Sequence, residues 1–126
     1  MKTPGADPPE QAHHIVQNAA VNPAKDVALS NDAPAINLVG SKGDRSTPHG
    51  KASEVQRLTP LGGTYGDESA VAYIGLKAAG MNKQRATKEV DRADAFFKDQ
   101  KGWNDSTPTA VPKDRMNHPD RAKDDQ

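Results

Sequence analysis

Residues 10–21, EQAHHIVQNAAV, place two adjacent histidines, His13 and His14, directly before a short apolar run. The β-branched Ile15 and Val16 favour an extended backbone, so this stretch predicts a strand or the start of one. Neighbouring side chains of a strand point to opposite faces. Both imidazoles can therefore serve one cleft only if the backbone twists or bulges at this point.

The composition predicts a small domain with a thin core. Only 33% of the 126 residues are hydrophobic and 4% are aromatic, whereas glycine and proline supply ten residues each. This composition predicts one domain with long irregular segments, and a bound metal ion would help to stabilise so small a core. Because the chain has no cysteine, disulfides and thiolate zinc fingers are excluded, and His, Asp, Glu and Asn are the available ligands.

A second strand and a short helix are predicted after the histidine pair. Apolar and polar side chains alternate in AINLV at 35–39, which predicts the strand. After a loop, Ser46 or Thr47 can cap a helix over about residues 49–58, which Pro60 terminates. The histidine pair and these two elements form a β-β-α unit.

Two longer helices are predicted in the second half of the chain. Asp67 is the expected N-cap of a helix over residues 68–79, and Asn82 is the expected N-cap of a helix over residues 83–100. We expect the two helices to pair as an αα-hairpin. The expected apolar faces are Val71, Ile74 and Ala78 in the first helix and Ala86, Val90, Ala93 and Phe97 in the second.

The predicted class is therefore α+β, with one domain. We expect a flexible lead-in at residues 1–11, a single domain at 12–111 and a disordered tail at 112–126. Within the domain, residues 12–58 hold the β-β-α unit and residues 67–100 hold the helical hairpin.

Charge and hydropathy narrow the possible partners. No stretch approaches the roughly 20 apolar residues of a membrane span, and the N-terminus has no apolar core of a signal peptide. The formal net charge of zero argues against a protein that coats nucleic acid indiscriminately. Residues 40–60 are net positive and contain His49, which suggests either a phosphate site or a solvated loop. Their charged residues are Lys42, Arg45, Lys51 and Arg57 against Asp44 and Glu54, a net of 4 − 2 = +2.

Paired histidines suit the hydrolysis of a phosphodiester bond. The reaction needs a base for the attacking water and a positive charge near the leaving oxygen. An imidazole can be the base, because its unperturbed pKa is about 6.5, and a neutral imidazole can hold a divalent metal. His13 and His14 could divide these tasks, with His49 at the head of the short helix as a second ligand. The alternative is that all three are surface histidines without a function.

Three pieces in this order resemble the His-Me finger (ββα-metal, HNH/endonuclease VII) nuclease superfamily: AHHIVQ at 12–17, NDAPAINLVG at 31–40 and TPHGKASEVQ at 47–56. More narrowly, the chain is similar to HHI-type nuclease toxin domains at the C-termini of polymorphic bacterial toxins, such as Rhs and type VI secretion effectors. The GGTYGDES joint at 62–69 and STPT at 106–109 also resemble that subgroup. The resemblance implies a small ββα-metal core followed by an αα-hairpin, with irregular N- and C-terminal segments.

The resemblance also implies residue roles. His14 would be the general base, with its other ring nitrogen held by a backbone carbonyl, and His13 and His49 would be metal ligands. Asn31 would be the central asparagine that orients the base, with Asn37 as a substitute and a turn or cap residue as the alternative. The residues expected at backbone phosphates are Arg45, Lys51 and Arg57. The chain departs from the family at Gln17, where relatives have proline.

The activity implied is that of a metal-dependent DNA endonuclease with little sequence specificity. One divalent ion would be bound, in the first place Mg²⁺, with Zn²⁺, Ni²⁺ or Mn²⁺ as alternatives. Such an antibacterial toxin would be secreted on a larger carrier, delivered into the target-cell cytoplasm and neutralised by a cognate immunity protein. Two alternatives stay open: a phage or mobile-element HNH endonuclease, and a non-enzymatic secreted adaptor. Convergence of the three histidines in the structure would favour the nucleases.

Overall fold

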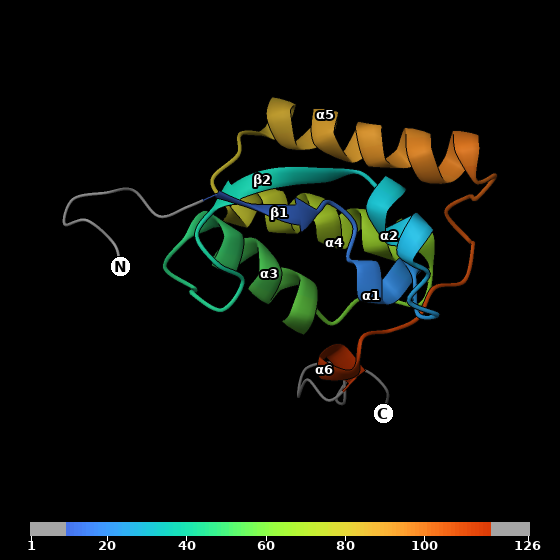
Figure 1. Cartoon of the computed structure of the whole chain (residues 1–126), viewed down its shortest axis with the longest axis horizontal. Helices are drawn as coiled ribbons and strands as arrows, with labels where there is room; N and C mark the ends of the chain where they lie inside the picture. Colours follow the sequence, from blue (N-terminus) through green and yellow to red (C-terminus); the bar gives the residue numbers. More distant parts are fainter. Residues whose placement is uncertain (1–9, 117–126) are drawn as a thin grey trace.

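A small antiparallel sheet and the helices around it form the domain (Figure 1). The computed structural model describes residues 10–116, and the predicted α+β class is confirmed. The elements in chain order are β1 (Glu10–His14), α1 (Asn18–Val21), α2 (Val27–Asp32), β2 (Ala35–Val39), α3 (Pro48–Leu58), α4 (Tyr65–Ala78), α5 (Lys83–Asp94), a π-helical turn (Ala95–Gln100) that continues α5, and α6 (Lys113–Met116).

The two strands pair in a regular register from Glu10 opposite Val39 to His14 opposite Ala35. The predicted strand at 35–39 is confirmed. The first strand ends at His14, and the apolar residues that predicted it, Ile15 and Val16, lie beyond it in the core. The expected lead-in is wrong at residues 10 and 11, because pairing with β2 orders them in spite of their polar side chains; residues 1–9 lie outside the described part.

The predicted helix after the sheet is confirmed as α3. Its N-cap is Thr47, whose hydroxyl accepts a hydrogen bond from the Gly50 amide at 3.2 Å. The preceding loop folds back tightly against this first turn, and a Cβ at Gly50 would lie 1.7 Å from the Asp44 carbonyl oxygen. Glycine at position 50 therefore allows the close approach that fixes the head of α3.

Helix α4 lies between α3 and α5 and packs against both. It begins one turn earlier than predicted, because Thr64 rather than Asp67 is the N-cap and accepts from the Asp67 amide at 3.2 Å. The predicted apolar face is also wrong, since Ile74 is 42% exposed and Ala78 is exposed. A helix with two helical neighbours buries two sides, and here the buried residues are Tyr65, Glu68, Val71, Ala72, Gly75 and Leu76.

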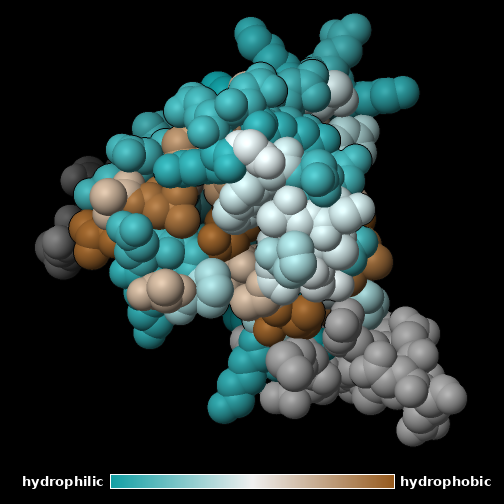
Figure 2. All heavy atoms as spheres, turned by 90° about the vertical axis from the view of Figure 1, so that its right-hand side faces the viewer, coloured by the Kyte–Doolittle hydropathy of each residue, from teal (hydrophilic) through white to brown (hydrophobic). Residues whose placement is uncertain are grey.

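The second long helix, α5, matches the prediction closely. Asn82 is its N-cap and accepts from the Arg85 amide at 2.8 Å. All four residues of the predicted apolar face are buried, and the π-helical turn also directs Phe96 inward beside Phe97. The opposite face is polar, and the upper part of Figure 2, where α5 lies, is largely hydrophilic.

The segment after α5 packs back against the rest of the domain. Trp103 packs on Tyr65 and Phe97, with ring centroids 5.9 and 5.0 Å away. The Ala110 amide then donates to the Ala20 carbonyl at 2.9 Å. The expectation of a disordered tail from 112 is wrong for residues 113–116, since these form α6 and the side chain of Arg115 is fully buried.

Residues 117–126, with His118, lie outside the described part. Within residues 10–116, no helix is long and apolar enough to cross a membrane.

Candidate active site

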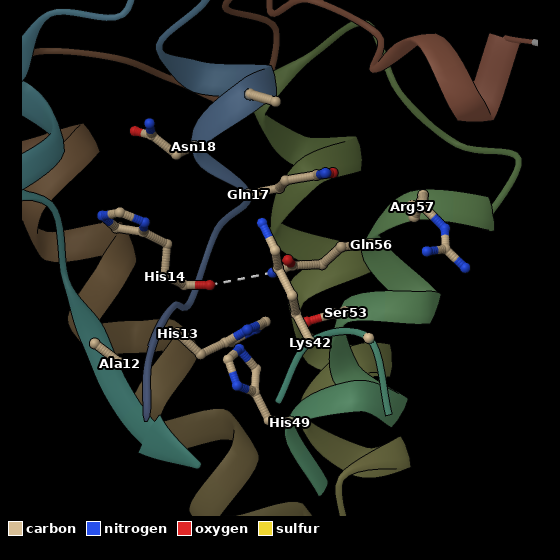
Figure 3. A pocket seen from close by; sticks show the side chains of 12 residues that line it. Ala12, His13, His14, Gln17, Asn18, Lys42, His49, Ser53, Gln56 and Arg57 are labelled. Carbon is tan, nitrogen blue, oxygen red and sulfur yellow. Dashed lines mark hydrogen bonds between the residues drawn. The ribbon is translucent and has the colours of Figure 1, made fainter. Parts of the chain in front are cut away.

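His13, His14 and His49 line one cavity of about 520 Å³ (Figure 3), which we call the histidine cavity. It lies where the end of β1, the start of α1, the loop after β2 and one face of α3 meet. Convergence of these histidines is the condition that separates a catalytic site from scattered surface histidines. The other polar residues of the lining are Gln17, Asn18, Lys42, Ser53, Gln56 and Arg57.

His13 and His49 form a close pair. Both side chains are 5% exposed, their ring centroids lie 5.2 Å apart, and the ring planes are nearly perpendicular, at 84°. Figure 3 shows the two rings side by side. A metal held about 2.1 Å from an imidazole nitrogen lies roughly 3.2 Å from the ring centre, so two such ligands 90–110° apart place their ring centres roughly 4.5–5.3 Å apart. The observed spacing therefore fits a shared metal ion.

The environment of the pair prepares both rings to be ligands. Burial lowers the pKa of His13 to about 4, with smaller contributions from the charges of His49 and His14, so His13 stays neutral near pH 7. His49 Nδ1 lies 3.2 Å from the Gly40 carbonyl oxygen. Because a carbonyl oxygen only accepts, Nδ1 carries the proton, and Nε2 keeps its lone pair for a metal.

Two protein ligands are what this site offers. Within residues 10–116, no group of three or more His, Cys, Asp or Glu side chains could hold a metal ion. A cation on His13 and His49 would need water or phosphate oxygens to complete its coordination. Such open coordination is typical of catalytic rather than structural metal sites.

His14 is held in the orientation expected of a general base. Its Nε2 donates to the Ser30 carbonyl oxygen at 2.8 Å, which leaves Nδ1 as the unprotonated nitrogen. In Figure 3 its ring lies on the other side of β1 from the His13–His49 pair. β1 contains no bulge, since its register is regular up to His14. Both residues line the histidine cavity, which extends from the end of β1 to the start of α1.

The carbonyl that holds His14 comes from a helix that the sequence did not predict. Asp26 caps α2 by accepting from the Ala28 amide at 2.9 Å, and the carbonyl of Ser30 lies in the last turn, where helical carbonyls have no intrahelical partner. Asn31 is exposed and not part of the cavity lining. Asn37 is also exposed, opposite Ala12 in the sheet. The role expected of Asn31 stays a prediction.

The structure brings one of the three predicted phosphate-contacting residues to the cavity. Arg57 lines it, whereas Arg45 lies outside and pairs with Glu54 at 3.2 Å on the surface. Lys51 is exposed and does not line it. Helical spacing explains the difference, since positions 49, 53, 56 and 57 share one side of α3 and position 51 faces away. Lys42, to which the resemblance assigned no role, contributes the second positive charge.

The sequence also failed to reveal the clamp on the backbone at the histidine pair. Gln56 Nε2 donates to the carbonyl oxygens of His14 and Ile15, at 3.1 and 3.2 Å. The first of these bonds is the dashed line in Figure 3. One side chain of α3 thereby fixes the backbone where the chain leaves β1. The sequence indicates it only by spacing, because Gln56 follows His49 by seven residues and so lies on the same side of the helix.

The fold and the site together define a class of protein. A two-stranded antiparallel sheet followed by a helix, with histidines of the first strand and of the helix head in one cavity, is the ββα arrangement that the HNH/endonuclease VII resemblance implies. Residues 7–98 match the family model Tox-SHH, described as an HNH/Endo VII superfamily toxin with a SHH signature, and the chain belongs to this family. In this chain the residue before the histidine pair is alanine, Ala12. No curated protein and no solved structure matches the chain.

Membership makes the chain a toxin domain of a nuclease superfamily. A toxin acts in the cells that receive it, so the family is consistent with delivery into target cells.

Proposed function

We propose that the domain is a metal-dependent endonuclease that hydrolyses phosphodiester bonds of DNA with little sequence specificity. The observation that supports this best is the histidine cavity, in which His14 and His49 each give one ring nitrogen to a backbone carbonyl and keep the other available. Scattered histidines would have favoured the adaptor alternative, whereas the three histidines line one cavity.

In this proposal His14 is the general base. Its Nδ1 takes a proton from the attacking water, and the bond from Nε2 to the Ser30 carbonyl keeps the ring in place. The same carbonyl stabilises the imidazolium that forms, because its dipole faces the charged ring. The Gln56 clamp on the His14 carbonyl prevents the backbone from shifting during the transfer.

His13 and His49 would hold one divalent cation. When bound, such an ion supplies a Lewis acid that stabilises charge on the phosphate and on the leaving oxygen. Mg²⁺ is the ion that the resemblance implies, whereas a pair of imidazoles also suits Zn²⁺, Ni²⁺ or Mn²⁺. The neutral, buried His13 and the oriented His49 suit Zn²⁺ and Ni²⁺ best, whereas Mg²⁺ would keep mainly oxygen ligands from water or phosphate.

Lys42 and Arg57 would bind the phosphates next to the reacting one. Both line the histidine cavity, and both side chains are exposed enough to meet a DNA backbone. Contacts to phosphate carry no sequence information, which agrees with cleavage of low specificity. Arg45 and Lys51 lie outside the cavity and could contact only phosphates further along the strand.

We also propose the biology of an antibacterial toxin. The domain would be delivered on a larger secretion-associated carrier into the cytoplasm of the target cell, and an immunity protein would protect the producer. The family description as a toxin supports this. An acidic inhibitor that covers Lys42 and Arg57 would suit the charge around the cavity.

Cleavage of supercoiled plasmid tests the proposal. The full chain is incubated with Mg²⁺, Mn²⁺, Ni²⁺ or Zn²⁺, or with EDTA, beside His14→Ala and the control Lys88→Ala, an exposed residue of α5 outside the cavity lining. We expect metal-dependent nicking that EDTA and His14→Ala abolish and that Lys88→Ala preserves. Absence of DNA cleavage with every metal would refute the DNase, and cleavage of RNA alone would reassign the substrate.

A further inference from the structure

Arg115 is the most completely bonded polar side chain of the described structure. It comes from α6, 17 positions beyond the end of the family match at residue 98, and its side chain is 0% exposed. A guanidinium has five N–H donors, and all five are used here. The acceptors are the Gln56 and Leu61 carbonyls, the Gln17 side-chain oxygen and both carboxylate oxygens of Glu68.

Two of these acceptors belong to the walls of the histidine cavity. Gln17 follows His14 by three residues and lines the cavity, and it accepts from Nη2. Gln56 also lines the cavity, and its carbonyl accepts from Nε while its side chain holds the His14 and Ile15 carbonyls. The guanidinium thus ties the chain after β1 to the helix that carries His49. Gln56 alone links Arg115 to the His14 carbonyl.

The remaining contacts fix the guanidinium itself. Glu68 of α4 is 1% exposed and accepts from Nη1 and Nη2 at 2.7 Å each, a bidentate pair that sets the plane of the guanidinium group. Two backbone hydrogen bonds hold the segment before α6 against the start of α4. The Tyr65 amide donates to the Thr107 carbonyl, and the Thr109 amide donates to the Gly63 carbonyl. Figure 1 shows α6 below α1 and α3, and Arg115 joins Gln17, the residue before α1, to Gln56 of α3.

We infer that Arg115 is a positioning residue of the histidine cavity: it locks Gln17 and Gln56 together and so sets the place of His14. Its effect on catalysis rests on the proposed nuclease function, whereas its effect on the histidine geometry does not. Helix α6 accordingly supports the site, although it lies outside the matched family region.

The test compares Arg115→Lys with Tyr65→Phe in the full, metal-free chain. A lysine keeps the charge but cannot form the planar five-bond arrangement. Tyr65→Phe is a matched control, because it removes a partly buried hydrogen bond of 2.6 Å, to Asp94, from outside the cavity lining. Long-range ¹H–¹⁵N spectra of the imidazoles report the tautomer of each histidine, and thermal unfolding reports stability.

We expect Arg115→Lys to change the His14 signals toward a mixture of tautomers and Tyr65→Phe to leave them as in the wild type. If cleavage is observed, kcat should fall roughly 10- to 100-fold in Arg115→Lys with little change in KM, as for a displaced catalytic group. Unchanged His14 signals in a folded Arg115→Lys, or equal changes in both variants, would overturn the inference.

A second variant covers the case in which Arg115→Lys does not fold. Arg115→Met with Glu68→Met removes both buried charges together at similar volume, an exchange that proteins often tolerate. We expect this folded double variant to show the same change at His14, and wild-type signals in it would overturn the inference. If the wild type itself cuts no nucleic acid, the proposed function fails while the histidine spectra still test Arg115.

Discussion

The buried His13 should make the metal-free domain sensitive to mild acid. Its pKa is lowered from 6.5 to about 4, first by burial and then by the charges of His49 and His14. In the unfolded chain the same imidazole binds a proton near pH 6.5. Between these two values the unfolded state holds a proton that the folded state lacks, so acid favours unfolding.

The sign and the size of the effect follow from proton linkage. At pH 7 His13 is mostly neutral in both states, and the free energy of unfolding then falls as the pH is lowered through 6.5 toward 4. A pKa difference of this size corresponds to a loss of roughly 3 kcal/mol, of which roughly 2.5 kcal/mol is reached by pH 4.5. Because His13 is only 5% exposed, solvent screening does not reduce the figure much.

Urea unfolding of the EDTA-treated chain at several pH values measures the effect. His13→Leu serves as the comparison, since it removes the titrating ring from the same buried position while the acidic residues keep titrating. We expect the wild type to lose about 2–3 kcal/mol more than His13→Leu between pH 7 and pH 4.5. Parallel stability curves for the two proteins would refute the reasoning about His13.

Three further predictions follow from the structure. Gly50→Ala should destabilise the fold by about 3 kcal/mol or more, measured by urea unfolding, because a Cβ would lie 1.7 Å from the Asp44 carbonyl oxygen; wild-type stability would contradict that close approach. Lys42→Ala should lower kcat/KM for plasmid cleavage about tenfold, whereas Lys88→Ala on the exposed side of α5 should not, and equal effects would exclude a specific phosphate contact. A chain ending at Pro112 should lose about 3–5 kcal/mol in thermal or urea unfolding, because Glu68 would stay buried without its partner; a loss below 1 kcal/mol would refute the importance of α6.

The sequence predicted the parts of this molecule that depend on local patterns. The β2 alternation, the Thr47 and Asn82 caps and the buried face of α5 all follow from side chains within one or two turns. The place of His49 was predictable for the same reason, because a cap and a proline fix the start of α3. That His49 lies close to His13 and His14 was then predicted from the family resemblance.

The features that failed depend on contacts between distant residues. Nothing near Ile74 shows that α4 is covered on two sides, so its predicted face was wrong. The Ser30 carbonyl acts through its backbone, which no side-chain motif reveals. Arg115 lies in a polar, charged segment typical of a tail, and only partners as far away as Gln17 explain its burial.

The central claim is that His14 is the base of a hydrolytic site. The most direct test is the initial rate of metal-dependent plasmid nicking by His14→Ala, measured without and with added imidazole beside the wild type. We predict that the rate is lost in the variant and partly restored by imidazole, which replaces the missing ring in the cavity. A His14→Ala chain that nicks plasmid at the wild-type rate would contradict the assignment.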